Sequence, residues 1–75
     1  MAPAADTDER LLMLQIAVSE ARTKHEDLVQ RRDLMERTKH YASAQALRIR
    51  ADRAFLDLRN ASRKLASYLS ERARR

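Results

Sequence analysis

The chain has 75 residues, 44% of them hydrophobic and 36% charged, with a formal net charge of +5. It has no Cys and no Gly, so disulfides and cysteine-bound metals are excluded, and tight turns and phosphate-binding loops that need Gly at positive φ are disfavoured. A chain this short forms a single domain with a thin core, and its abundant Ala, Leu, Arg and Glu indicate an all-α fold.

The first predicted helix covers residues 6–37 and follows a disordered tail over residues 1–5. Pro3 opposes an earlier start, and Asp6 with Glu9 three residues later forms a capping-box pattern. Within this helix an a/d heptad pattern predicts packing along another helix. Its residues are Leu11, Leu14, Val18, Ala21, His25, Leu28, Arg32 and Met35.

A turn is predicted over residues 38–43, because the heptad pattern changes phase between Met35 and Ala44. The segment also contains several weak helix formers, namely Thr38, His40, Tyr41 and Ser43. The segment contains no Gly or Pro, and apolar residues recur every seven positions straight through it, from Leu14 to Leu56. One continuous helix of about 100 Å is therefore the alternative.

The second predicted helix covers residues 44–73 and carries the most regular pattern of the chain, with alternating steps of four and three. The pattern consists of Leu47, Ala51, Ala54, Leu58, Ala61, Leu65 and Tyr68. In an antiparallel hairpin, residues 11–18 would lie beside residues 62–69, and His25 would lie near Phe55.

Residues 1–37 hold six basic and eight acidic side chains, and residues 38–75 hold ten basic and three acidic ones. These opposite charges favour pairing of the two helices.

A two-helix hairpin covers one face of each helix and leaves other apolar residues uncovered. The candidate partner-binding residues are Leu12, Ile16, Ile49, Phe55, Leu56 and Leu69. This surplus indicates that the hairpin is completed by self-association or by a protein partner. The predicted function is a non-enzymatic, cytoplasmic interaction module: a small adaptor, a co-chaperone, an assembly factor or a homo-oligomeric bundle.

The alternative function is a basic helical hairpin that binds nucleic acid or the ribosome. Its candidate contacts are Arg48, Arg50, Arg59, Arg63 and Lys64. Against this alternative, the basic residues are distributed around the helix and are interrupted by Asp52 and Asp57. The spacing of Arg48 with Asp52, and of Arg53 with Asp57, predicts ion pairs on a solvated surface.

No motif for catalysis, phosphate binding or zinc binding is present. His25 and His40 lie fifteen residues apart without carboxylates at ligand spacing, and Met13 and Met35 are interpreted as packing residues. The apolar run over residues 11–18 is too short to span a bilayer and follows acidic residues, unlike a signal peptide. We therefore expect no enzyme activity, cofactor, metal, small-molecule substrate or membrane partner.

Overall fold

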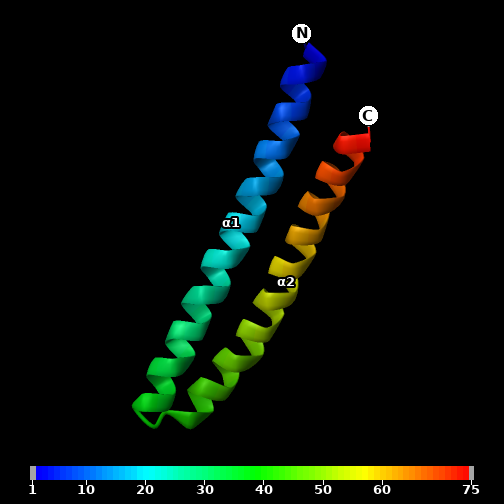
Figure 1. Ribbon diagram of the computed structural model, residues 1–75. Coiled ribbons are helices and arrows are strands. Elements are labelled where there is room, and N and C mark those ends of the chain that lie inside the picture. The colour runs from blue at the N-terminus through cyan, green and yellow to red at the C-terminus, as the bar shows by residue number, and fades with distance from the viewer. Residues whose placement is uncertain (1, 75) are drawn as a thin grey trace.

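The computed structural model describes the backbone of residues 2–74 and the side chains of residues 9–74. Within this range the chain forms two α-helices, α1 over Ala2–Arg37 and α2 over Tyr41–Arg74, arranged as an antiparallel hairpin (Figure 1). The molecule measures 57 × 19 × 13 Å, and its radius of gyration is 17.0 Å. A compact domain of this length would have a radius of about 11 Å. The predicted all-α hairpin is confirmed, and the alternative of one continuous helix is wrong.

The helix boundaries differ from the predicted ones. The backbone of α1 is helical from Ala2, before the predicted start at Asp6. Pro3 falls in the first turn, where its missing N–H would have no intrahelical acceptor in any case. The side chains of residues 2–8 lie outside the described part of the structure, so the capping box at Asp6 stays a prediction. At the other end of the hairpin, α2 begins at Tyr41 and the turn is shorter than predicted.

The turn consists of Thr38, Lys39 and His40. Lys39 has a φ of 63°, in the left-handed region that Gly usually occupies. The Lys39 N–H donates to the carbonyl oxygen of Glu36 at 3.1 Å, and the His40 N–H donates to that of Met35 at 2.8 Å. These two bonds define a Schellman motif, which ends α1 and reverses the chain without a glycine.

The same short segment also begins α2. The Ala44 N–H donates to the carbonyl oxygen of His40 at 2.9 Å, which makes His40 the N-terminal boundary of the new helix. The Thr38 hydroxyl donates to the carbonyl oxygen of Leu34 at 2.9 Å, and Thr38 Oγ1 also lies 2.8 Å from His40 Nδ1. The last turn of α1 and the first residue before α2 are therefore connected directly.

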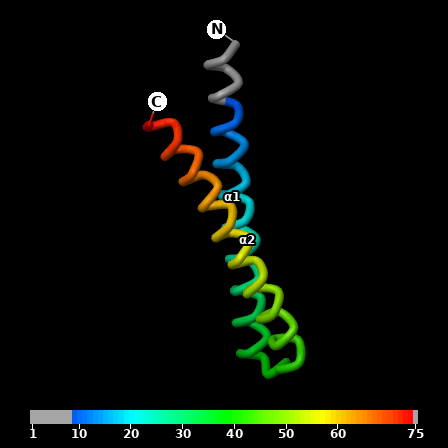
Figure 2. The backbone as a smooth tube through the Cα atoms, turned by 90° about the vertical axis from the view of Figure 1, so that its right-hand side faces the viewer, coloured from blue at the N-terminus to red at the C-terminus, as the bar shows by residue number. Residues whose placement is uncertain are grey.

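The core lies along the contact between α1 and α2, and it consists of the two predicted heptad patterns. Every residue of both patterns is buried or half-buried. Among the side chains of residues 9–74, those classed as buried are Val18, Leu28, Ala44, Ala51 and Ala54. Because three of these are alanines, the helices approach closely around them but enclose little apolar volume. Toward the termini α1 and α2 diverge (Figure 2).

Side-chain contacts confirm the predicted antiparallel register. The His25 and Phe55 rings have centroids 5.6 Å apart, as the sequence predicted. Nearer the termini, the Arg10 guanidinium carbon lies 5.5 Å from the centroid of the Tyr68 ring. Near the turn, Arg48 Nη2 lies 3.2 Å from Glu36 Oε1. The helices therefore pack against each other over most of their length.

Candidate protein-binding surface

The predicted partner-binding side chains are all exposed, with 40–62% of their surface accessible. The whole molecule exposes 6145 Å². A compact monomer of the same mass would expose about 4,700 Å². The hairpin therefore presents roughly 1,400 Å² more surface than a globular chain of its size, and part of this surplus is large apolar side chains.

Five of the exposed apolar residues of α2 form a band along its length, which we call the α2 stripe. It consists of Tyr41, Ile49, Phe55, Leu56 and Leu69. Tyr41, Phe55 and Leu69 occupy e positions at intervals of fourteen residues, beside the buried contact with α1. Ile49 and Leu56 occupy f positions on the outer surface of α2, and the charged residues Arg48, Asp52, Arg59 and Arg63 lie among the five apolar ones.

Tyr41 belongs to this stripe although the sequence did not identify it. The sequence predicts Tyr41 in the turn, where its side chain has no defined orientation. In the structure Tyr41 is the first residue of α2. Its spacing of fourteen residues from Phe55 was visible in the sequence and would have identified it once the helix start was known. With 66% of its surface exposed, Tyr41 is more accessible than any of the predicted residues.

Phe55 contacts the other helix of the hairpin. Its ring packs against His25 at an interplanar angle of 54°, and yet half of its surface remains exposed. A large aromatic side chain whose orientation is already set by its neighbours loses little conformational entropy on binding. Phe55 is therefore suited to be the central contact of an interface.

Leu12 and Ile16 are not part of this band. They lie at b and f positions on the outer surface of α1, near its N-terminal end. The Arg10–Tyr68 contact places this part of α1 beside the end of α2 that carries Leu69. Phe55 and Leu56 are consecutive residues of α2, Ile49 lies two turns before Leu56, and the two α1 residues form a separate apolar area.

The five basic residues of the alternative function do not share one side of the hairpin. Arg48 lies on the same side as Phe55 and is bound to Glu36, so the predicted pair with Asp52 is not formed. Arg50 and Lys64 lie at g positions, on the opposite side of the helix contact; Arg59 and Arg63 lie at b and f positions.

Other ion pairs also differ from the prediction. Among residues 9–74, Arg31 pairs with Asp27 at 3.1 Å and Arg32 with Asp33 at 3.1 Å. The predicted pair of Arg53 with Asp57 is not formed. Local spacing allowed these pairs, but exposed side chains at i and i+4 gain only a few tenths of a kcal/mol from pairing.

The side opposite the α2 stripe carries a local concentration of positive charge. A shallow hollow there is lined by Lys24, Arg50 and Arg53 around Leu28 and Ala54, with Asp57 at its edge. A second hollow, nearer the ends of the helices, is lined by Arg10, Arg63 and Lys64, among others, and Arg63 shares the f position of Ile49 and Leu56. We call the surface around Lys24 and Arg50, which lies across the helix contact from Phe55, the basic side.

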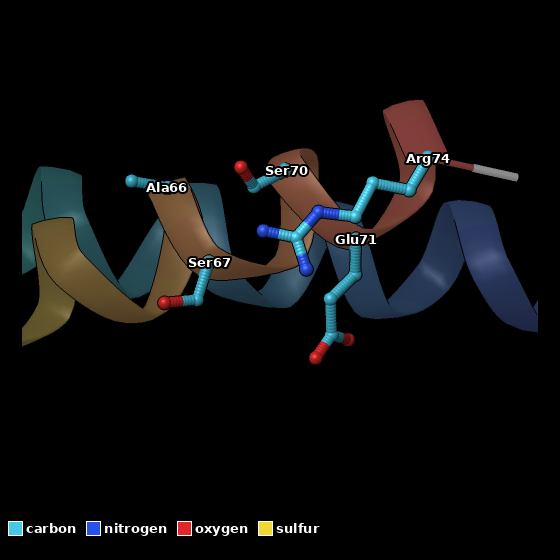
Figure 3. Close-up of a pocket in the computed structure, with 5 residues that line it drawn as sticks. All are labelled: Ala66, Ser67, Ser70, Glu71 and Arg74. Atoms are coloured by element: carbon cyan, nitrogen blue, oxygen red, sulfur yellow. The ribbon is translucent and has the colours of Figure 1, made fainter.

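A third surface depression lies at the end of α2 and is lined by Ala66, Ser67, Ser70, Glu71 and Arg74 (Figure 3). All five residues come from one helix, and the Arg74 side chain runs back along it toward the preceding turn. A small-molecule site needs walls from more than one element to bury its ligand. This depression therefore offers no enclosed binding site.

The described side chains, those of residues 9–74, contain no group of three or more His, Asp or Glu residues that could hold a metal ion. No helix within residues 2–74 is long and apolar enough to cross a membrane. Comparison with known protein families, with curated proteins and with solved structures found no match to this chain.

Proposed function

We propose that this protein is a non-enzymatic helical interaction module that binds a helical surface of another chain through the α2 stripe. The observation that carries the proposal is the stripe itself: five large apolar side chains of α2 remain exposed at positions outside its packed face. Exposed apolar surface of this extent is typical of protein-binding sites. Such a module would act as an adaptor, co-chaperone or assembly factor.

A cytoplasmic location is part of the proposal, since a chain without Cys fits a reducing compartment.

The expected affinity is moderate. Each stripe side chain is already about half covered, so its complete burial would contribute on the order of 1 kcal/mol. Five such side chains and five on a partner would contribute roughly 10 kcal/mol, from which association subtracts at least about 4 kcal/mol. The remainder of about 6 kcal/mol corresponds to a Kd in the tens of micromolar. The module is therefore suited to reversible contacts.

Charge substitutions in the stripe test the proposal. Leu56→Glu and Ile49→Glu should each abolish capture of a partner, because the new carboxylate would be buried in the interface without a counter-charge, at a cost of several kcal/mol. Both positions are exposed in the hairpin, so the free energy of unfolding of an isolated hairpin should change by less than ~0.5 kcal/mol. Capture by tagged protein, followed by titration of the purified partner, measures the effect.

Arg50→Glu is the matched control, because Arg50 lies at a g position on the basic side and is not three or four residues from any stripe residue. It should retain every partner that depends on the stripe. Identical capture by wild type, by both stripe variants and by the control would contradict the proposed function.

A basic hairpin that binds nucleic acid is the second candidate, favoured by the gathering of Lys24, Arg50 and Arg53. If the hairpin binds DNA, a plot of the logarithm of the binding constant against the logarithm of salt concentration should have a slope of about −0.9 per phosphate contact. Arg50→Glu should weaken binding more than Arg59→Glu, which lies away from this cluster. Absence of binding to DNA or RNA at about 50 mM salt would remove the candidate.

A further inference from the structure

We infer that the α2 stripe binds a second copy of this chain, with the two α2 helices antiparallel about a twofold axis at Phe55. The inference rests on the proposed function and names the partner of the same surface. It follows from three properties of the hairpin: the spacing of the stripe, the charges that lie within it and the amount of surplus surface.

The spacing of the stripe is symmetric about Phe55. Tyr41 lies fourteen residues before it and Leu69 fourteen residues after it. In an antiparallel pair centred on Phe55, Tyr41 of one copy therefore meets Leu69 of the other, at both ends of the interface. Phe55 meets its own equivalent at the axis, and Leu56 lies one residue away from it. A twofold interface requires this kind of self-complementary surface.

The charges between the e and f positions of the stripe are complementary in the same arrangement. Asp52 lies three residues before Phe55, Arg59 lies four residues after it, and both occupy b positions. Both are exposed, and neither forms an ion pair with another described residue. In the antiparallel pair, Asp52 of each copy faces Arg59 of the other. In a parallel pair, Asp52 would face Asp52 and Arg59 would face Arg59, which disfavours that orientation.

The surplus surface is larger than the area that a standard dimer interface removes from one partner. The hairpin exposes 6145 Å², roughly 1,400 Å² more than a compact monomer of its mass. A standard interface removes about 800 Å² from each partner. The opposite side of the hairpin is not equivalent, because two copies meeting there would bring Lys24, Arg50 and Arg53 against the same cations.

Charge exchange across the axis tests the pairing. In sedimentation equilibrium up to ~200 µM, the wild-type chain should show a monomer–dimer equilibrium. Asp52→Arg and Arg59→Asp should each weaken association at least about tenfold, because each places like charges opposite one another twice. The double variant restores both contacts and should dimerise within about threefold of wild type. Arg50→Glu, on the basic side, should leave dimerisation unchanged.

The absence of native Cys allows the orientation to be read directly. When Tyr41→Cys and Leu69→Cys chains are mixed and oxidised, a disulfide should join one variant to the other. Neither variant alone should form much disulfide, since its two thiols would lie at opposite ends of the dimer. Disulfides within each variant, and none between them, would overturn the antiparallel arrangement.

A wild-type chain that remains monomeric at the highest concentration, or a double charge variant that does not recover, would overturn the inference. The proposed function is judged separately. If the chain is monomeric but Leu56→Glu loses a partner that Arg50→Glu retains, the stripe binds a different protein. If neither dimerisation nor capture depends on Leu56, both the inference and the proposed function fail.

Discussion

Lys39→Gly should stabilise the protein, although substitutions to glycine usually destabilise helical proteins. Lys39 adopts a φ of 63° at the end of α1. This left-handed conformation costs a residue with a Cβ about 1–2 kcal/mol, a penalty that Gly does not have. Gly also increases the entropy of the unfolded chain, which offsets roughly 0.5–1 kcal/mol of the gain. The net expectation is a free energy of unfolding that rises by about 0.5–1 kcal/mol.

For a domain of this size, that gain corresponds to a rise in Tm of roughly 4 °C. Circular dichroism at 222 nm during thermal and urea unfolding measures both quantities. Because self-association would make Tm depend on concentration, the comparison should be repeated at a tenfold higher protein concentration. A gain of equal size at both concentrations would assign the effect to the turn.

Gln30→Gly provides the matched control, since Gln30 is exposed within α1. There the same substitution should lower the free energy of unfolding by about 1 kcal/mol. The opposite signs of the two variants are the signature of a left-handed turn at Lys39. If Lys39→Gly destabilises the protein as much as Gln30→Gly does, then residue 39 is helical in solution, and the hairpin itself is refuted.

Other predictions concern the core and the ion pair near the turn. Leu28→Ala should lower the free energy of unfolding by about 3 kcal/mol, because Leu28 is 3% exposed. Urea denaturation measures the loss, and a loss below ~1 kcal/mol would contradict the place of Leu28 in the core. Ala51→Leu should also destabilise the protein, by about 1–3 kcal/mol, because the close helix contact at Ala51 leaves no room for a larger side chain. An increase in Tm would argue against that close approach of the helices. In a double-mutant cycle, Glu36→Ala and Arg48→Ala should show a coupling energy of no more than about 0.5 kcal/mol, since both side chains remain substantially exposed. A coupling energy above ~1 kcal/mol would show that the ion pair is desolvated.

Much of the fold could be predicted from the sequence, because the determining signals are local and periodic. The repeat from Leu47 to Tyr68 has the period of a helix packed along another helix, and only one face of each helix can carry such a repeat. Opposite charges on the two halves favoured their pairing, and the position of the turn set the register that placed His25 beside Phe55. Exposure of the partner-binding candidates followed from the same reasoning, since a residue off the buried face of a two-helix hairpin has nothing to cover it.

The turn could not be predicted in detail, because the residue in the left-handed conformation is a lysine. Lys39 has no intrinsic preference for positive φ, and it is held there by the hydrogen bonds that the Lys39 and His40 N–H groups make with α1. Such bonds exist only once α1 has formed and ended. The start of α2 depends on the same arrangement, so the membership of Tyr41 in the stripe also depended on the folded turn.

The choice of charge partners was likewise decided by tertiary structure. Sequence spacing offered Arg48 an acidic neighbour at Asp52, whereas the folded hairpin places Glu36 within 3.2 Å of Arg48 from the other helix. Exposed ion pairs are weak, so a nearby group contributed by the second helix can replace the local one. The position of the basic side, across the helix contact from Phe55, has the same origin. Heptad position assigns each residue an angle around its own helix, but only the pairing of α1 with α2 determines which of those angles lie on the same side of the molecule.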